Sequence, residues 1–475
     1  MCRMTVSSPM CVAKVPRRIG GVEGHALSLP YVGRMRCDVW LSGLLRVAAV
    51  LVPVSAAHAQ KWVNPNFDAH RLDYRDLGYP DVSAIEADDS PITALLTAGS
   101  GLVYGATSGK SASVLFLYDR AINKVRPLGR IGDAKGVYHA LVQDSDGTLL
   151  IGGGLSMLAP VPLTQNFPGG FRAIEEQLWK DVVAPYADYP GGHLYRYDPV
   201  KGDAEARMPG ERCPLDDLGV PVKGNTVYAV ALDAKARRLY GITYPDARFF
   251  VWDLEKNKTL ENLPLLDRKV YSGPERTWRS VPRALHVAHD GSVFTSGEDG
   301  RIVVYVPNTK TLVRTDMQIP GEYYEAWNYY GYPVIEAWTA TPDGTLYGAS
   351  SDGYLFRLNQ ERTRLVNLGK PRLSRRVRGM TLGPDNRLYL LCGEFEEPCK
   401  LFSYGLDGEE GFRDWGGLTV DRSPYYAKRA YQFDAMATGI DGTLFMGESD
   451  RRACLYLFMP GAKPFPGGFN PRNPR

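Results

Sequence analysis

The chain of 475 residues carries no long run of one charge. Lys and Arg number 56 against 53 Asp and Glu, a net charge of +3. Proteins that bind nucleic acid neutralise phosphates with clustered basic side chains, so this balance argues against a nucleic-acid partner. An apolar run near the N-terminus covers residues 44–57. It is shorter than the about 20 residues that a transmembrane helix needs, and we expect no membrane span in the mature protein.

Cysteine is scarce, with seven in the chain, and no Cys or His spacing resembles a structural zinc site. Three of the seven precede residue 60, in a segment that we expect to be removed. Cys392 and Cys399 bracket a short excursion between two predicted strands. Because an exported chain permits disulfides, we expect these two to pair.

The N-terminal segment has the pattern of a secretory signal. Met35 and Arg36 precede the apolar run, and Ala57-His58-Ala59 provides a small-residue cleavage site. We expect residues 1–59 to be removed, the 34 residues before Met35 reflecting a start codon assigned too early. Residues 60–90 are then a leader to the folded domain, 91–475. The expected location is the periplasm or the medium.

One phrase recurs seven times after residue 91: a short apolar step ending in Ala or Gly, a polar turn, and an apolar strand that closes on a small residue. The copies begin at Ile92, Tyr138, Val227, Pro282, Ile335, Val377 and Phe433. Several are followed by a third strand, such as LFLYD from Leu115. Self-similarity of this kind is typical of stacked units, and strand-turn-strand units of this length predict an all-β, seven-bladed β-propeller.

Only one pair of copies is widely spaced. The second and third lie 89 residues apart, against 42 to 56 elsewhere. The excess predicts an insertion at about 155–190, with a short helix at 171–183, that serves as a lid, a binding loop or plain surface decoration. A second unusual segment, 321–333, holds one Trp and five Tyr. It is suited either to stacking on sugars or to packing over a neighbouring blade.

Six of the seven copies place an ionisable residue directly before the Ala or Gly. The aligned residues are Thr93, His139, Tyr228, Arg283, Glu336, Arg378 and Asp434. The innermost strands of a propeller line its channel, so these side chains should share one space near the axis. Unpaired buried charge is costly, which makes the ring either a functional site or a set of mutually paired ions that plugs the channel. No metal or other cofactor is predicted, although Glu336 and Asp434 leave a channel divalent cation open.

The ring residues suit the chemistry of β-elimination on a uronic acid. That reaction needs a cation for the carboxylate, a base for the adjacent proton and an acid for the leaving oxygen. Arg283 or a protonated His would supply the cation, and Tyr228 the base or acid if a neighbouring cation lowers its pKa. His139 or His193 titrates in the right range without such help. His193 lies one hairpin after His139 once the insertion is discounted.

With His139, His193 and Tyr228 in these places, the chain resembles the seven-bladed β-propeller polysaccharide lyases of the ulvan lyase and rhamnose–glucuronate lyase type. The resemblance implies that these three are catalytic and that an Arg one hairpin after the Tyr binds the carboxylate. That position is Tyr244 here, with Arg248 four residues on. Either Arg248 or Arg283 takes the carboxylate, or the activity is absent; Glu336, Arg378 and Asp434 complete the expected substrate-binding set.

The leading hypothesis is therefore an exported, monomeric lyase of an acidic polysaccharide or oligosaccharide. The rival is a propeller that binds a glycan or a protein without catalysis, because a fold does not fix a function. A WD40 scaffold is disfavoured because Trp252-Asp253 stands alone, and a quinoprotein is disfavoured because the eight Trp form no docking pattern.

Overall fold

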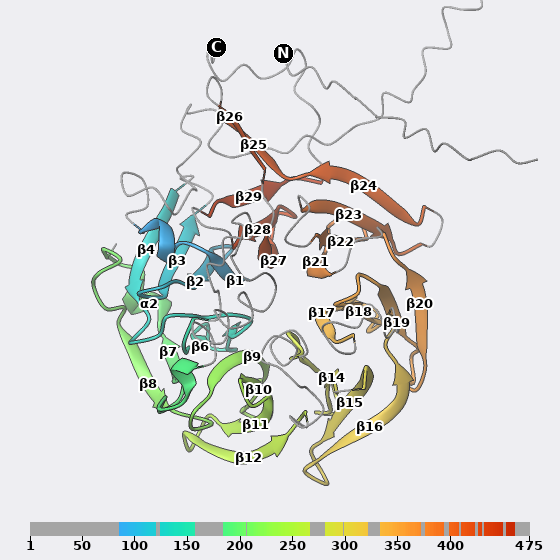
Figure 1. Ribbon diagram of the computed structural model, residues 1–475, viewed down its shortest axis with the longest axis horizontal. Coiled ribbons are helices and arrows are strands. Elements are labelled where there is room, and N and C mark those ends of the chain that lie inside the picture. Colours follow the sequence, from blue (N-terminus) through green and yellow to red (C-terminus); the bar gives the residue numbers. More distant parts are fainter. Residues whose placement is uncertain are drawn as a thin grey trace, which may run out of the picture. The chain divides into compact units, whose positions relative to one another are not determined.

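The computed structural model is a ring of seven small antiparallel sheets, which confirms the predicted all-β, seven-bladed propeller (Figure 1). It describes residues 85–119, 124–156, 184–205, 207–266, 281–297, 299–321, 333–371, 376–393, 399–407, 410–422, 426–429, 432–449 and 453–460. The expected signal peptide and nearly all of the leader, 60–84, lie outside these ranges. So do the expected helix at 171–183 and most of the aromatic segment, 322–332.

The first three blades each hold four strands in chain order from the channel outward. Blade one contains β1 (Ile92–Thr97), β2 (Val103–Thr107), β3 (Val114–Asp119) and β4 (Lys124–Arg130). Blade two contains β5 (Leu141–Gln143), β6 (Leu149–Gly152), β7 (Leu194–Tyr197) and β8 (Leu215–Gly219). Blade three contains β9 (Thr226–Asp233), β10 (Arg238–Tyr244), β11 (Arg248–Asp253) and β12 (Lys258–Pro264).

The next three blades repeat this order, and in the seventh the described residues form three strands. Blade four contains β13 (His286–Val287), β14 (Val293–Ser296), β15 (Arg301–Val306) and β16 (Thr311–Gln318). Blade five contains β17 (Ile335–Ala340), β18 (Leu346–Ser350), β19 (Leu355–Leu358) and β20 (Leu365–Gly369). Blade six contains β21 (Val377–Leu382), β22 (Arg387–Cys392), β23 (Lys400–Gly405) and β24 (Phe412–Gly417). Blade seven contains β27 (Phe433–Thr438), β28 (Leu444–Glu448) and β29 (Leu455–Phe458), after a hairpin of β25 (Thr419–Arg422) and β26 (Tyr426–Arg429).

In the part of the chain that the structure describes, helical structure is confined to short turns. They are a 3₁₀ turn at Ala87–Asp89, another at Ala184–Tyr186 and a single α-turn, α2, at Pro199–Gly202. Asp198 caps α2 by accepting a hydrogen bond from the Val200 amide. In the turn at Ala184–Tyr186, Tyr186 is buried and its hydroxyl lies 2.7 Å from Thr226 Oγ1 of blade three.

A glycine on the second strand explains part of the repeated phrase. Gly241 pairs with Phe250 across β10 and β11, and a Cβ on Gly241 would lie 2.2 Å from the Phe250 ring. Gly105 and Gly348 meet the rings of Phe116 and Phe356 in the same way. The glycine thus leaves room for an aromatic ring on the neighbouring strand, and the blade packs densely there.

The ring position is a β-bulge in five blades. The pairing of first and second strands shifts by one residue at Thr93, Tyr228, Glu336, Arg378 and Asp434. A bulge leaves one residue outside the ladder and redirects its side chain. The residue that follows must be small: a Cβ on Gly379 would lie 2.9 Å from the Cβ of Met436 on the next blade.

The predicted disulfide between Cys392 and Cys399 is wrong, because both residues are buried as thiols. Cys392 on β22 pairs with Lys400 on β23, so Cys399, the residue before Lys400, is offset from Cys392 by one position. Successive strand residues point to opposite faces. Cys392 accordingly packs with Phe402 on one face of blade six, and Cys399 packs with Leu401 on the other.

Candidate functional site

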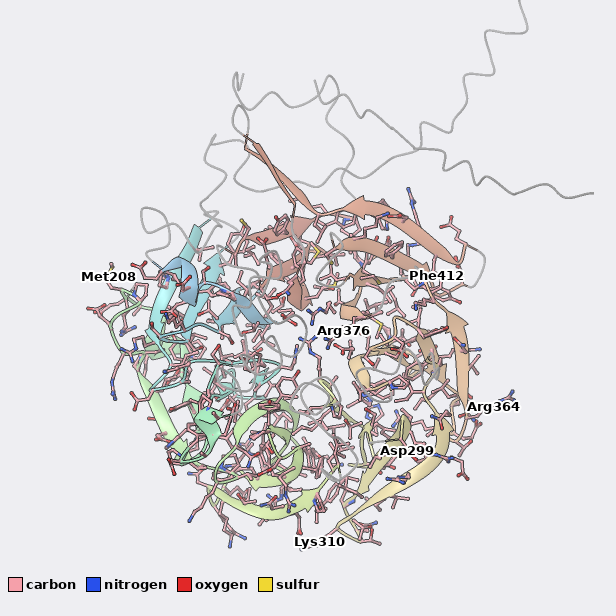
Figure 2. The ribbon with its side chains drawn as sticks, viewed as in Figure 1. Met208, Asp299, Lys310, Arg364, Arg376 and Phe412 are labelled. Carbon is pink, nitrogen blue, oxygen red and sulfur yellow. The ribbon has the colours of Figure 1, made fainter. Side chains whose placement is uncertain are left out.

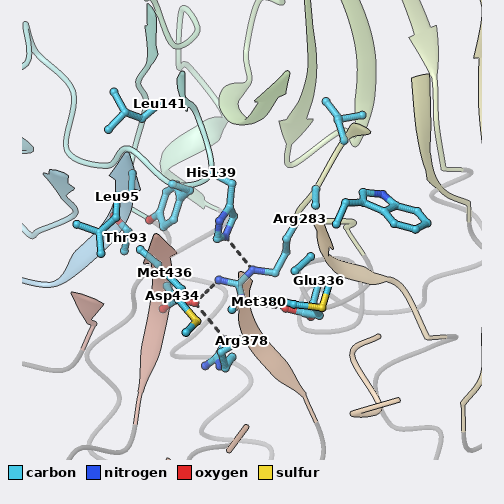
Figure 3. A pocket seen from close by; sticks show the side chains of 18 of the residues that line it. Thr93, Leu95, His139, Leu141, Arg283, Glu336, Arg378, Met380, Asp434 and Met436 are labelled. Carbon is cyan, nitrogen blue, oxygen red and sulfur yellow. Dashed lines mark hydrogen bonds and ion pairs between the residues drawn. The ribbon is translucent and has the colours of Figure 1, made fainter. Parts of the chain in front are cut away.

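A cavity of about 210 Å³ lies in the channel, and six of the seven ring residues line it (Figure 3). They are Thr93, His139, Arg283, Glu336, Arg378 and Asp434. Figure 3 shows the Arg283 side chain between His139, Glu336 and Asp434, and the four residues belong to four different blades. The alignment of the repeats therefore brings these distant residues to one place.

Arg283 is the centre of this group and is only 4% exposed. Its Nη1 donates to Glu336 Oε2 at 2.8 Å, and its Nη2 donates to Asp434 Oδ1. Its Nε donates to His139 Nε2 at 3.0 Å. All three nitrogens of one guanidinium are thus engaged, each by a different blade.

Two further arginines join the carboxylates. Arg376 Nη2 donates to Glu336 Oε1 at 2.6 Å, and Arg378 Nη1 lies 3.3 Å from Asp434 Oδ1. Figure 2 shows Arg376 near the centre of the ring, far from the labelled Lys310 at the rim. Among the described side chains, three buried guanidinium groups therefore face two carboxylates.

The electrostatics of the cluster keep its carboxylates ionised. Burial alone would raise the pKa of Glu336, but pairing with Arg376 and Arg283 lowers it to about 2. Burial alone would also raise the pKa of Asp434, but Arg283 and Arg378 hold this pKa well below its usual range. Burial, reinforced by the charge of Arg283, lowers the pKa of His139 to about 3. His139 is therefore neutral at pH 7, and its Nε2 is the acceptor for Arg283.

Arg378 is the least compensated member of the cluster. It is 6% exposed, and its Nε has no hydrogen-bond partner among the residues that the structure describes. Burial lowers the pKa of Arg378, and the charges of Arg376 and Arg283 lower it further. The attraction of Asp434 opposes this lowering but does not reverse it. Arg378 also lines the cavity, so an anion that reached its guanidinium would supply a missing acceptor.

Tyr228 lies beside the cavity rather than on its wall. Its ring meets that of His139 edge-on at 5.8 Å, and it packs into a cluster with Tyr138 and Tyr240. Burial raises the pKa of its hydroxyl, and the opposing influence of Arg283 does not reverse this. Tyr244 belongs to the same cluster and is fully buried. The lowered pKa that a tyrosine base requires is therefore not found at Tyr228.

His193 and Arg248 stand at or next to third strands, away from the cavity wall. His193 Nδ1 lies 2.9 Å from a carboxylate oxygen of Asp217, on the outer strand β8. Arg248 donates to the side chain and the carbonyl of Asn262, on the outer strand β12. Neither side chain lines the cavity.

Sequence reasoning missed the apolar part of the wall. The residue two positions after the ring residue is apolar in every copy, and all seven line the cavity: Leu95, Leu141, Val230, Leu285, Trp338, Met380 and Met436. We call this set the collar. The alignment that found the ring would have found the collar if read two residues further. Arg376 had no such signal, since it precedes the repeated phrase.

Among the described residues, no three His, Cys, Asp or Glu side chains gather as a metal site would require. The same part of the chain contains no helix long and apolar enough to cross a membrane.

No protein-family model and no curated protein match the chain. Solved structures similar to it include the extracellular domain of a putative one-component system from B. thetaiotaomicron, with 13% identity and a TM-score of 0.46 over 78% of this chain and 41% of the other. Another is the extracellular domain of a putative hybrid two-component system from the same organism, with 13% identity, a TM-score of 0.46 and 78% and 39% coverage. A streptogramin B lyase structure has 12% identity, a TM-score of 0.44 and 78% and 94% coverage. The chain thus spans about two fifths of the first two structures and nearly all of the third.

Proposed function

We propose that the channel cavity binds an anionic ligand and that the protein is a binding propeller rather than a lyase. The observation that supports this most strongly is Arg378, a buried arginine that lines the cavity and whose Nε lacks a partner among the described residues. A buried cation without full compensation is unfavourable, and a carboxylate on the ligand would offset it.

The contacts of the expected catalytic residues favour binding over β-elimination. The lone pair of His139 Nε2 is occupied by Arg283. The hydroxyl of Tyr228 has a raised pKa, so it is a poor base at neutral pH. His193 is paired with Asp217 outside the cavity wall. A lyase would have to rearrange all three, whereas a binding site uses the arginines as they stand.

We also propose that the protein is exported and acts in the periplasm or the medium. The support is the signal-like segment from Met35 to Ala59, with its basic start, apolar run and small-residue cleavage site. N-terminal sequencing of protein from the periplasmic fraction should begin at Gln60. Recovery of a chain that keeps Met35 in the cytoplasm would contradict export.

Two measurements separate binding from lysis. Isothermal titration with small carboxylates, glucuronate among them, should give one site per chain. Incubation with a panel of uronic-acid polysaccharides should give no rise in absorbance near 235 nm, the band of the unsaturated product. A rise that is abolished by Tyr228→Phe would overturn the binding proposal in favour of the lyase, and the absence of binding by every carboxylate would overturn it without replacing it.

A further inference from the structure

Blade seven differs from the other six at its outer edge. Blades one to six each end in a fourth strand, whereas the outermost described strand of blade seven is its third, β29. The hairpin of β25 and β26 does not extend this blade, since those two strands form a separate sheet. All four residues of β29, Leu455–Phe458, are buried and aliphatic or aromatic. An apolar edge strand offers its backbone groups to a further strand, which makes β29 a docking edge.

The third strands share a short sequence pattern. In blades one, two, five and six it is Leu, an aromatic residue, any residue, and then Tyr or Leu. The four segments are 115–118, 194–197, 355–358 and 401–404. β29 reads Leu-Tyr-Leu-Phe, so it resembles the third strands that pair with a fourth.

The fourth strands of the same four blades also share a pattern. Each has Leu or Trp directly before a glycine, and the glycine has the positive φ that other residues rarely adopt. The glycines are Gly129, Gly219, Gly369 and Gly416, with φ of 106°, 111°, 100° and 99°. The pairing with the third strand shifts there, which leaves the Leu or Trp in a β-bulge.

A side chain fixes this bulge in three of the four strands. An Asp or Asn two residues before the glycine accepts a hydrogen bond from the glycine amide. The acceptors are Asp217 at 2.9 Å, Asn367 at 2.8 Å and Asp414 at 2.7 Å. The sequence Asp or Asn, then Leu or Trp, then Gly is therefore a signature of a fourth strand in this chain.

The same signature stands before blade one, in the leader. Residues 74–78 read Tyr-Arg-Asp-Leu-Gly, and residues 412–416 of β24 read Phe-Arg-Asp-Trp-Gly. The spacing to the next blade also agrees. The glycines at 129, 219, 369 and 416 precede the ring residues at 139, 228, 378 and 434 by 10, 9, 9 and 18 residues, and Gly78 precedes Thr93 by 15.

The start of the described chain lies beside β29. Ile85 is fully buried in one cluster with Leu455 and Leu457. Five residues on, Ser90 Oγ accepts a hydrogen bond of 3.1 Å from the amide of Ala453. The leader therefore ends next to the edge that lacks a described partner. The C-terminal segment, 461–475, is a poorer candidate, because it lacks the signature and has four prolines, which cannot donate to a sheet.

We propose that residues 74–78 are the fourth strand of blade seven and pair with β29. The register shared by the other four blades sets Gly78 opposite Leu455 and Asp76 opposite Tyr456, with Leu77 in the bulge. Leu128 and Leu218, at the bulge of blades one and two, belong to the clusters that join their blades to the next. Leu77 would likewise join the cluster between blades seven and one.

This strand would build the last blade from both ends of the chain. Cleavage after Ala59 would leave it on the mature protein, so the leader would be part of the folded domain. Blade seven also supplies Asp434 to the wall of the channel cavity. The strand would therefore help to hold one carboxylate of the candidate site in place.

Hydrogen exchange of the chain that begins at Gln60 tests the proposal without any substitution. The amides of residues 74–78 should exchange about a hundredfold more slowly than those of an unstructured peptide, as those of residues 412–416 in β24 should. Exchange of residues 74–78 at the rate of an unstructured peptide, with residues 412–416 protected, would overturn the proposal.

A pair of cysteines tests the register. Arg75 falls opposite Leu457, as Arg413 lies opposite Ser403 in blade six. Arg75→Cys combined with Leu457→Cys should form a disulfide on oxidation, identified by mass spectrometry of the linked peptides, because paired residues lie within disulfide reach. Asp73→Cys combined with Leu457→Cys is the matched control, two residues out of register, and should stay reduced. Equal linkage in both pairs would overturn the register, and linkage between two chains would assign the edge to a second copy instead.

Discussion

The ring residues of blades one to three, the neutral half, make different contacts from those of blades four to seven, the charged half. In blades one to three the ring residues are Thr93, His139 and Tyr228, all uncharged at neutral pH. Thr93 bonds to the neighbouring blade through the Val137 carbonyl, and Tyr228 packs into a cluster of tyrosines. In blades four to seven every ring residue is ionised, buried and joined to another by an ion pair.

The difference shows that one repeated position can close the ring in two ways. The neutral half uses hydrogen bonds and aromatic packing, which leave no net charge. The charged half uses ion pairs between arginines and carboxylates, and these line the cavity. His139 joins the two halves, because it accepts the hydrogen bond of Arg283 without carrying charge itself.

The largest expected effect is in the charged half. Glu336→Ala removes the carboxylate that pairs with both Arg283 and Arg376, so that each of these buried cations loses an ion pair. Breaking a buried pair in this way should lower the free energy of unfolding by about 3–5 kcal/mol, measured by urea denaturation. Glu410→Ala is the control: Glu410 pairs with Arg387 but is 63% exposed, and its loss should cost less than about 1 kcal/mol. Equal losses would mean that the cluster is not a buried network.

A smaller effect is expected in the neutral half. Thr93→Val keeps the shape of the side chain but removes the hydroxyl that bonds to Val137 and lies 2.6 Å from Ser108 Oγ. Losing these hydrogen bonds should cost about 0.5–1.5 kcal/mol in the same assay, because Ser108 and the Val137 carbonyl still bond to each other. The exposed Thr309→Val serves as the control, with an expected change within about 0.5 kcal/mol. A loss at Thr93 as large as that at Glu336 would remove the distinction between the halves.

The smallest effect is a change in pH dependence at the junction. The folded-state pKa of His139, about 3, lies below the unfolded value of 6.5, so the unfolded chain binds the proton first. Its contribution to stability is therefore complete above pH 6.5 and is lost as the pH falls toward 3. His139→Gln should make the fall in stability between pH 6.5 and 4.5 shallower, while His286, whose pKa is lowered to about 4 by burial, keeps part of it.

Urea denaturation at a series of pH values measures this change. The lower limit of pH 4.5 avoids the titration of Glu336, whose folded pKa is depressed to about 2 and whose contribution is lost only below that limit. An unchanged slope in His139→Gln would show that the imidazole is accessible to protons in the folded chain.

The repeats predicted the architecture because each blade needs the same pattern of apolar strand residues to bury its faces, so the pattern recurs once per blade. The alignment also placed Arg283, Glu336 and Asp434 together, since equivalent positions around a ring converge on its axis. It could not predict the ion pairs, which depend on side-chain reach across blades. The alignment also missed Arg376, which precedes the strand. Its φ of 69° lies in the left-handed region, so its side chain does not follow the alternation of the strand.

The expected roles of His193 and Arg248 came from the spacing of hairpins along the chain. Spacing predicts which strand a residue occupies but not how far from the axis its side chain lies. Both residues precede or begin a third strand, and each bonds outward to the fourth strand of its blade. The pairing of Cys392 and Cys399 failed for a related reason, because closeness in sequence does not place two side chains on the same face.

The most direct test of the anion site is glucuronate binding by Arg378→Met, measured by isothermal titration. Arg387→Met is the matched control, a buried arginine of the same blade that bonds to Ser403 and Glu410 away from the channel. We predict one site per chain in the wild type and in Arg387→Met, and affinity at least tenfold weaker in Arg378→Met. Binding that is unchanged in Arg378→Met would contradict the account, because the uncompensated guanidinium would then play no part in the site.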